Sequence, residues 1–217
     1  MTNTLRKFSI LGDSISTFQG YSPWGAEHYG PDTGAVTGVC TVEDTWWMQV
    51  IQALGGELLS NLSISGNTIV TEGKMGGFPT ARLRQLTVDG VTPDHILLYA
   101  GLNDAIFYLP PEVFGAEYRR LLARTQREYP RAQLHCGTLL LGAVGGDQRS
   151  MRPLVQRLAP YNDAIRQAVE DAGVHLVDLA AMGFRYTSLD AFHPNGEGMK
   201  QLASLWLRAL DAAPSEG

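Results

Sequence analysis

Residues 8–20 read FSILGDSISTFQG, and the role of Ser14 in this stretch depends on which residues the rest of the chain places beside it. A short apolar run ends at Gly12, and Asp13 and Ser14 follow at once. An apolar run of this length, bounded by a turn signal, is typical of a buried strand. Ser14 is therefore either a turn residue that ends the strand or a nucleophile placed at the carboxyl end of the strand.

Short, nearly continuous apolar runs recur along the whole chain. Such runs indicate strands covered on both faces, as in a parallel sheet. Stretches with helical spacing separate them, which predicts right-handed βαβ crossovers and an α/β fold. We expect a doubly wound three-layer sandwich with a central parallel sheet of about five strands, forming a single domain over residues 1–217. The runs are Phe8–Leu11, Glu57–Leu62, His95–Ala100, Gln133–Leu141 and Val174–Leu179.

Four segments between or after these runs are predicted to be helices. The first covers 45–54, with Asp44 as its expected N-cap and Gly55 as its stop. Three others carry apolar stripes at 114–122, 154–169 and 199–210. Pro194 is well suited to the first helical position, so the last helix is predicted to begin there.

Charge and composition disfavour several classes of function. The formal net charge is −5 and no cluster of basic residues stands out, so nucleic acid is not an expected partner. No apolar stretch reaches the roughly 18 residues that a membrane span needs, and we see no signal peptide. Cys40 and Cys136 form no CxxC motif and are expected to be free thiols. The sequence therefore predicts a cytoplasmic protein that makes no membrane contact.

Polar and glycine-containing blocks follow the predicted strands, where an open α/β sheet places its active crevice. Taken singly, each block has a plain structural explanation, as a cap, a turn or a glycine with positive φ. Their order along the chain, and their shared edge of the sheet, instead favour one combined site. The blocks are Gly12-Asp13-Ser14, Gly66, Gly101-Leu102-Asn103-Asp104 and Asp190-Ala191-Phe192-His193.

These blocks supply complementary parts of a nucleophilic site. Serine is a poor nucleophile at neutral pH and needs an adjacent base, usually histidine, which in turn needs a carboxylate to orient it. The short spacing between Asp190 and His193 lets the carboxylate reach Nδ1 while Nε2 points to Ser14. The backbone N–H groups of Ser14 and Gly66 and the side-chain amide of Asn103 are the candidate oxyanion donors.

In this order the four blocks resemble those of the SGNH or GDSL hydrolase family, over residues 8 to about 210. The resemblance implies a flavodoxin-like sheet. It also implies that Ser14 is the nucleophile, His193 the base and Asp190 its orienting carboxylate, with Gly66 and Asn103 in the oxyanion hole. We expect neither a metal ion nor an organic cofactor.

Aromatic residues in or beside the long segment 16–43 are candidate substrate contacts. Trp46 and Trp47 point about 100° apart on a helix, so one is expected in the core and the other over the loop. The functional alternative is that Trp46 or Trp47 lines the substrate pocket, together with Tyr21, Trp24 or Tyr29 from the long segment. We expect His28 at a solvated surface position. The other non-catalytic histidines lie at or within predicted strands, where structural roles are expected; they are His95, His135 and His175.

The sequence therefore predicts a serine esterase whose partner is a small-molecule ester. We expect a short, acetyl-like acyl group on a polar alcohol such as a carbohydrate, cleaved through an acyl-enzyme. Three alternatives stay open. An acyltransferase would use an alcohol in place of water, a thioesterase would use the same site on a thioester, and a non-catalytic binding module would keep only the fold.

Overall fold

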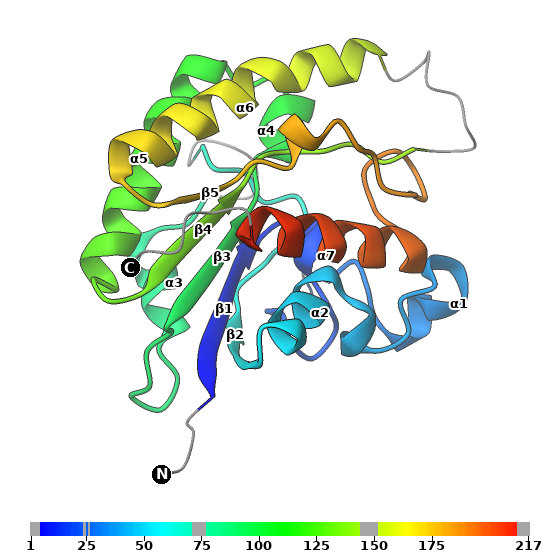
Figure 1. The fold of residues 1–217 in the computed structure, drawn as a ribbon, viewed down its shortest axis with the longest axis horizontal. Coiled ribbons are helices and arrows are strands. Elements are labelled where there is room, and N and C mark those ends of the chain that lie inside the picture. Colours follow the sequence, from blue (N-terminus) through cyan, green and yellow to red (C-terminus); the bar gives the residue numbers. More distant parts are fainter. Residues whose placement is uncertain (1–4, 24, 26, 71–76, 144–151, 212–217) are drawn as a thin grey trace.

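A parallel sheet of five strands, in the order β2-β1-β3-β4-β5, forms the centre of the fold (Figure 1). The computed structural model describes residues 5–23, 25, 27–70, 77–143 and 152–211. The strands lie on the five predicted apolar runs, so the predicted α/β sheet is confirmed, although the fourth strand ends well before Leu141. Their bounds are Arg6–Gly12 (β1), Gly56–Asn61 (β2), His95–Tyr99 (β3), Gln133–Gly137 (β4) and His175–Val177 (β5).

Helices cover both faces of the sheet and complete the three layers (Figure 1). On one face α2 (Trp46–Ala53) packs against α7 (Gly196–Asp211), and on the other α5 (Pro111–Glu128) packs against α6 (Arg152–Ala172). None of the helices in the described ranges is both long and apolar enough to cross a membrane. Short elements lie in the connections: α1 (Gly34–Thr37), α3 (Thr80–Leu83), α4 (Leu102–Ile106), and the 3₁₀ turns η1 (Ser14–Ser16), η2 (Pro31–Thr33), η3 (Val42–Asp44), η4 (Arg84–Leu86) and η5 (Ala180–Met182).

Two helix starts differ from the sequence prediction. Thr45, not Asp44, is the N-cap of α2, because its hydroxyl accepts the N–H of Met48. The Asp44 carboxylate instead accepts the backbone N–H groups of Cys40 and Thr41, just before the turn η3. Helix α7 begins at Gly196 rather than at Pro194. Asparagine is a strong N-cap, and the side chain of Asn195 accepts the N–H of Gly198 at 2.9 Å, which fixes the helix start two residues later.

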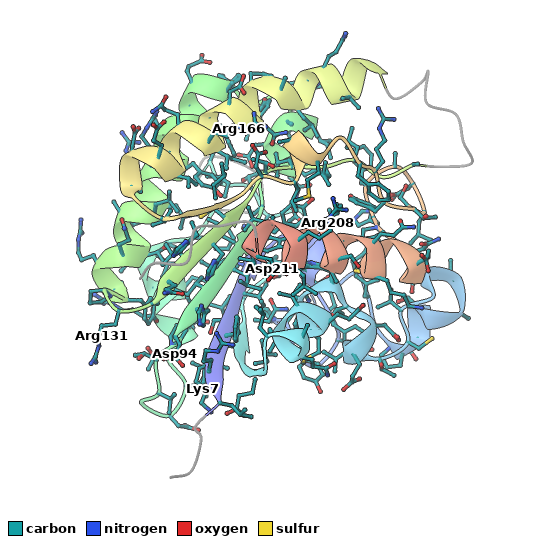
Figure 2. All side chains as sticks on the ribbon, viewed as in Figure 1. Lys7, Asp94, Arg131, Arg166, Arg208 and Asp211 are labelled. Carbon is teal, nitrogen blue, oxygen red and sulfur yellow. The ribbon has the colours of Figure 1, made fainter. Side chains whose placement is uncertain are left out.

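Polar contacts hold α6 against the carboxyl edge of the sheet. Arg166, labelled in Figure 2, donates two hydrogen bonds of 2.9 and 3.0 Å to the carboxylate of Asp178, just after β5. Asn162 holds the backbone of Leu139, just after β4, by accepting its N–H at 2.7 Å and donating to its C=O at 3.0 Å. Both helix contacts fix backbone that directly follows a strand, at the carboxyl edge of the sheet.

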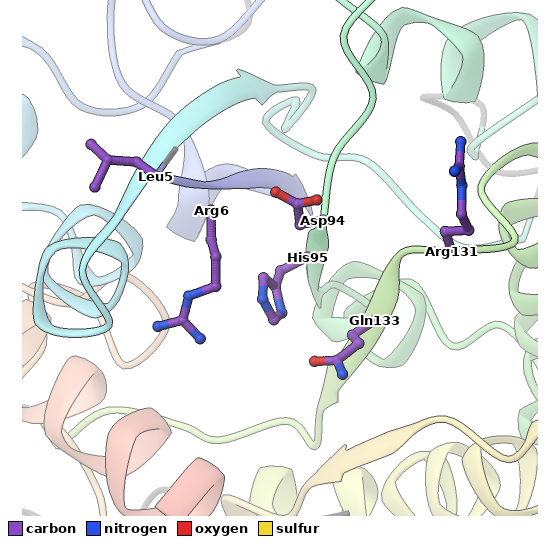
Figure 3. Close-up of a pocket in the computed structure, with 6 residues that line it drawn as sticks. All are labelled: Leu5, Arg6, Asp94, His95, Arg131 and Gln133. Carbon is purple, nitrogen blue, oxygen red and sulfur yellow. The ribbon is translucent and has the colours of Figure 1, made fainter. Parts of the chain in front are cut away.

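The opposite, amino edge of the sheet carries a cavity of about 560 Å³ (Figure 3). The backbone N–H of Lys7 donates to the Asp94 carboxylate at 2.7 Å beside this cavity, joining β1 to the turn before β3. Because Ser14 follows the carboxyl end of β1, the cavity and the predicted site lie at opposite edges of the sheet. The residues that line it are Leu5, Arg6, Asp94, His95, Arg131 and Gln133.

A row of stacked rings crosses the sheet from β1 to β5: Phe8, His95, His135 and His175. Successive ring centroids lie 4.5, 5.4 and 4.9 Å apart. His95 Nδ1 and His135 Nε2 lie 3.1 Å apart, a hydrogen bond that needs one neutral ring to donate and the other to accept. Burial, together with the neighbouring charges of His95 and His175, lowers the pKa of His135 to about 3. The folded chain therefore keeps this ring neutral.

This row makes the fold sensitive to acid. The unfolded chain binds a proton at His135 below its usual pKa of 6.5, whereas the folded chain does not until about 3, so stability falls as the pH falls through that window. Between about pH 7.5 and about pH 5, wild type should lose about 2 kcal/mol more unfolding free energy than His135→Phe, which keeps a stacked ring without a titrating group. Urea unfolding at the two pH values measures the difference. Parallel pH dependence in the two proteins would contradict the assignment.

Candidate active site

The predicted nucleophile lies on a tight turn directly after β1. Gly12 ends the strand, and a Cβ atom there would lie 2.6 Å from the Cβ of Ser16 and 2.8 Å from the hydroxyl of Ser63. Only glycine therefore fits at that position without moving the turn. Asp13, which precedes Ser14, caps the turn by accepting the N–H of Ile15 at 3.1 Å.

Ser16, at the end of the same turn, is held by two other elements. Its backbone carbonyl accepts a hydrogen bond of 2.8 Å from the side chain of Asn61, the last residue of β2. Its hydroxyl accepts one of 3.2 Å from the indole of Trp46, in the first turn of α2. All three side chains are buried, so the turn that carries Ser14 is fixed from both sides.

Asp190, His193 and Ser14 form one chain of hydrogen bonds. His193 Nε2 lies 2.8 Å from Ser14 Oγ, and His193 Nδ1 lies 2.7 Å from Asp190 Oδ2. With Nδ1 protonated toward the carboxylate, Nε2 is left to accept the serine proton. The structure thus brings together the three side chains that the sequence analysis selected, from the two ends of the chain.

A compact loop holds Asp190 in place. Its second carboxylate oxygen, Oδ1, accepts the backbone N–H groups of Phe192 at 3.0 Å and His193 at 2.8 Å. Ala191, between Asp190 and Phe192, has a left-handed backbone, with φ of +77°. Partial burial pushes the pKa of Asp190 upward, but the hydrogen bonds from His193 and Phe192 outweigh it and leave the pKa below its usual value. The carboxylate is therefore ionised at neutral pH.

The two other predicted oxyanion donors lie on neighbouring loops. The chain after β2 continues alongside β1, where the N–H of Ile64 donates to the C=O of Gly12 at 3.4 Å, and the turn that follows contains Gly66 with φ of +75°. Asn103, in α4, donates a side-chain hydrogen bond of 2.9 Å to the C=O of Asn67. This contact fixes the Asn103 amide against the Gly66 turn.

Two buried carboxylates, Asp13 and Asp104, hold the backbone of the loops that carry Ser14 and Gly66. Asp104, in α4, accepts the backbone N–H groups of Ile69 and Val70 at 2.9 and 3.0 Å. Burial raises the pKa of Asp104 to about 6 and that of Asp13 to about 7, against the lowering effect of their backbone hydrogen bonds. Their roles are to hold backbone groups, and sequence spacing alone gave no signal that Asp104 would reach a loop more than thirty residues earlier.

The tryptophans require a correction. Trp46 and Trp47 are both fully buried, so neither lines a substrate pocket. Trp46 stacks on Trp206 of α7 with ring centroids 4.7 Å apart, besides supporting Ser16. Both indoles belong to the core because α2 packs against the sheet and against α7. The Trp47 ring lies 6.4 Å from that of Tyr21 in segment 16–43, so one of the pair does lie beside the loop, as expected, but it is buried there. Trp24 lies outside the described residues.

His28 was predicted to be solvated, but its ring lies flat on that of His193. The ring centroids are 3.8 Å apart and the planes differ by 13°. Burial lowers the pKa of His28 to about 4, with the nearby charge of His193 acting in the same direction and that of Asp190 opposing it. The sequence held no periodic signal for this contact, since segment 16–43 is an irregular loop.

Comparison with known proteins places this arrangement in a family. The model of the GDSL-like lipase/acylhydrolase family matches residues 10–201, which span all four polar blocks. No curated protein matches the sequence.

Solved structures share the fold over nearly the whole chain. A candidate GDSL-like lipase from Bacteroides ovatus is 21% identical, with a TM-score of 0.72 over 96% of this chain and 99% of that one. TesA is 17% identical, with a TM-score of 0.64 over 94% and 98%. EstA is a psychrotrophic esterase from Pseudoalteromonas sp., and its structure is of the form inhibited by monoethylphosphonate. It is 18% identical, with a TM-score of 0.60 over 95% of this chain and 97% of that one.

The buried position of Trp46 predicts that it affects stability rather than substrate binding. Trp46→Phe should lower the unfolding free energy by about 1–3 kcal/mol, because it removes core volume and the bond to Ser16. The matched variant Trp47→Phe removes an indole N–H that has no partner among the described residues, so it should cost about 1 kcal/mol less. Chemical unfolding and ester kinetics measure both. A raised KM in Trp46→Phe would instead place this indole against the substrate.

Proposed function

The chain belongs to the GDSL-like lipase/acylhydrolase family, and on that premise we propose that it is a serine esterase in which Ser14, His193 and Asp190 form the catalytic triad. The observation that carries the proposal is the pair of short contacts on either side of His193, 2.8 Å to Ser14 Oγ and 2.7 Å to Asp190. Both contacts lie within the hydrogen-bond range that proton transfer to and from His193 requires.

The reaction follows from this geometry in two halves. Ser14 Oγ attacks the acyl carbon of the ester while its proton passes to His193 Nε2, and Asp190 stabilises the imidazolium. The C–O bond to the alcohol then breaks as His193 returns the proton to the leaving oxygen, which gives an acyl-enzyme on Ser14. Water repeats the sequence, with His193 taking its proton, and releases the acid.

The negative charge on the tetrahedral intermediate needs donors that are already in place. We assign this role to the backbone N–H groups of Ser14 and Gly66 and to the side chain of Asn103. An asparagine amide has two N–H bonds, and Asn103 uses one on the C=O of Asn67, which leaves the second for the oxyanion. That internal bond fixes the amide plane before substrate arrives.

For the substrate we propose a short, acetyl-like acyl group on a polar alcohol such as a carbohydrate, with no nucleic acid or membrane as partner. The net charge of −5 supports a neutral or cationic alcohol over a phosphate-rich one. Directly after α4, which carries Asn103, Phe107 and Tyr108 are 46% and 70% exposed. The Arg157 guanidinium covers one face of the Tyr108 ring, 3.9 Å from its centroid, so the Phe107 ring and the other face of Tyr108 are the surfaces that suit a sugar ring. Two free cysteines, Cys40 and Cys136, support a reducing, cytoplasmic location.

Replacement of the nucleophile tests the reaction class. Wild type should hydrolyse p-nitrophenyl acetate and butyrate and gain one adduct with a serine-reactive phosphonate, the class of inhibitor seen in EstA. Ser14→Ala should lose both turnover and adduct while it melts like wild type, since no other side chain supplies the attacking oxygen. Steady-state kinetics and intact mass measure these outcomes.

The matched control is Ser65→Ala, which removes a second serine near Gly66 and should still form the phosphonate adduct. An adduct that survives in Ser14→Ala would overturn the nucleophile assignment. A well-folded wild type with neither turnover nor adduct would favour the binding module. Matched ester and thioester substrates, together with product analysis in the presence of an added polyol, separate the esterase from the thioesterase and the acyltransferase.

The assigned oxyanion donor makes a second prediction. Asn103→Ala should lower kcat by about 10²–10³ with little change in KM, because the lost hydrogen bond forms fully only in the transition state. Thermal unfolding controls for the loss of the contact with Asn67. An equal rise in KM with unchanged kcat would mean that Asn103 binds the ground-state substrate and does not stabilise the intermediate.

A further inference from the structure

Three contacts restrain the His193 ring: its hydrogen bonds to Asp190 and Ser14, and a stacking contact with a residue outside the triad. The hydrogen bonds at Nδ1 and Nε2 lie in the plane of the ring and run outward from its edges. They leave the ring free to rock about the line between Asp190 and Ser14. A flat group against the face of the ring blocks that motion, and His28 lies there, 3.8 Å away and within 13° of parallel.

The backbone of His28 is tied to the nucleophile. Its N–H donates to the hydroxyl of Thr17 at 2.8 Å, and that hydroxyl donates to the C=O of Ser14 at 2.8 Å. Thr17 is fully buried, so this link is shielded from water. The ring that covers the base is therefore positioned from the turn that carries the nucleophile.

The next residue ties the same segment to the base. The phenol of Tyr29, which is buried, donates a hydrogen bond of 2.8 Å to the C=O of Pro194, directly after His193. Further along the segment, the C=O of Gly38 lies only 2.2 Å from where a Cβ of Gly196 would stand, so the loop lies tightly against the start of α7. Segment 28–38 thus contacts both partners of the Ser14–His193 hydrogen bond.

The charge state of His28 fits a role beside a transient cation. The titratable groups that face it are His193, Asp190 and Tyr29. With its pKa lowered to about 4, mainly by burial, His28 is neutral while the enzyme works. The π face of a neutral ring attracts a cation, so it favours the imidazolium that forms as the Ser14 proton moves to His193 Nε2. A protonated His28 would repel it.

We propose that His28 is a positioning residue, whose ring holds the plane of His193 so that Nε2 stays aimed at Ser14 Oγ. It exchanges no proton with the substrate and acts only through His193. The kinetic part of this inference rests on the proposed esterase function, whereas the structural part concerns the orientation of the His193 ring alone.

Paired substitutions at position 28 test the need for a flat ring. His28→Leu keeps comparable volume without an aromatic face and should lower kcat at least about tenfold on p-nitrophenyl acetate, with KM within about twofold, because small misalignments of reacting groups are costly. His28→Phe restores the face and should stay within about threefold of wild type. His28→Ala is a second non-aromatic variant. The control is Val36→Ala, at a residue 81% exposed on α1 of the same segment, and its kinetics should be unchanged.

A spectroscopic readout reports the orientation without turnover. The His193 Nδ1 proton, held by Asp190, should give a low-field proton NMR signal that is identified by its loss in His193→Ala. The signal should persist in His28→Phe and weaken or vanish in His28→Leu and His28→Ala, as the ring rocks and its proton exchanges with water. If wild type shows the signal but no esterase activity, the proposed function fails while this readout still tests His28.

Two results would overturn the proposal. One is wild-type kcat and an undiminished low-field signal in His28→Leu and His28→Ala. The other is an equal loss of both in His28→Phe and His28→Leu, which would mean that the imidazole itself, and not its flat face, is required.

Discussion

The hydrogen bond between Ser14 and His193 is the contact on which the rest of the structure depends, because it joins residues 179 positions apart in the chain. Neither side chain lies on a rigid element of its own. Ser14 lies on a turn after β1 and His193 on a loop before α7, so their separation is set by how the first strand and the last helix pack. The stack of Trp46 on Trp206 provides that packing, since it joins the support of the Ser14 turn to α7. A core contact thereby sets the geometry at the surface.

The parallel sheet brings polar backbone groups together at its carboxyl edge, and carboxylate side chains accept hydrogen bonds from the N–H groups there. Asp13 holds the turn of Ser14, Asp104 holds the chain after the Gly66 turn, and Asp190 holds the loop of His193. Burial raises the pKa of the first two, whereas the more exposed Asp190 keeps a lowered one because more hydrogen bonds reach it. The same residue type thus has two functions: two carboxylates organise backbone, and the third orients the histidine next to it.

Much of this arrangement was predictable from the sequence, because continuous apolar runs and the polar blocks after them are local signals. The strands and the cluster of Ser14, Asp190 and His193 follow from such signals together with the rule that parallel strands end at one edge. Tertiary packing decided the rest. Thr45 caps α2 in place of Asp44, and Asn195 caps α7 after Pro194. Helix α7 covers Trp46, and Trp47 is buried beside Tyr21 of the long loop. His28 lies on an irregular loop, where no period indicates what a side chain will contact.

The long span between Ser14 and His193 also has a consequence for how the protein is made. During synthesis the first strand and its serine leave the ribosome long before the segment that carries the base. In the proposed mechanism the serine has no base to activate it until that segment has emerged and α7 has docked. Hydrolytic competence would then appear only once α7 packs beside α2, and a chain interrupted before His193 would hold the Ser14 turn without its proposed base.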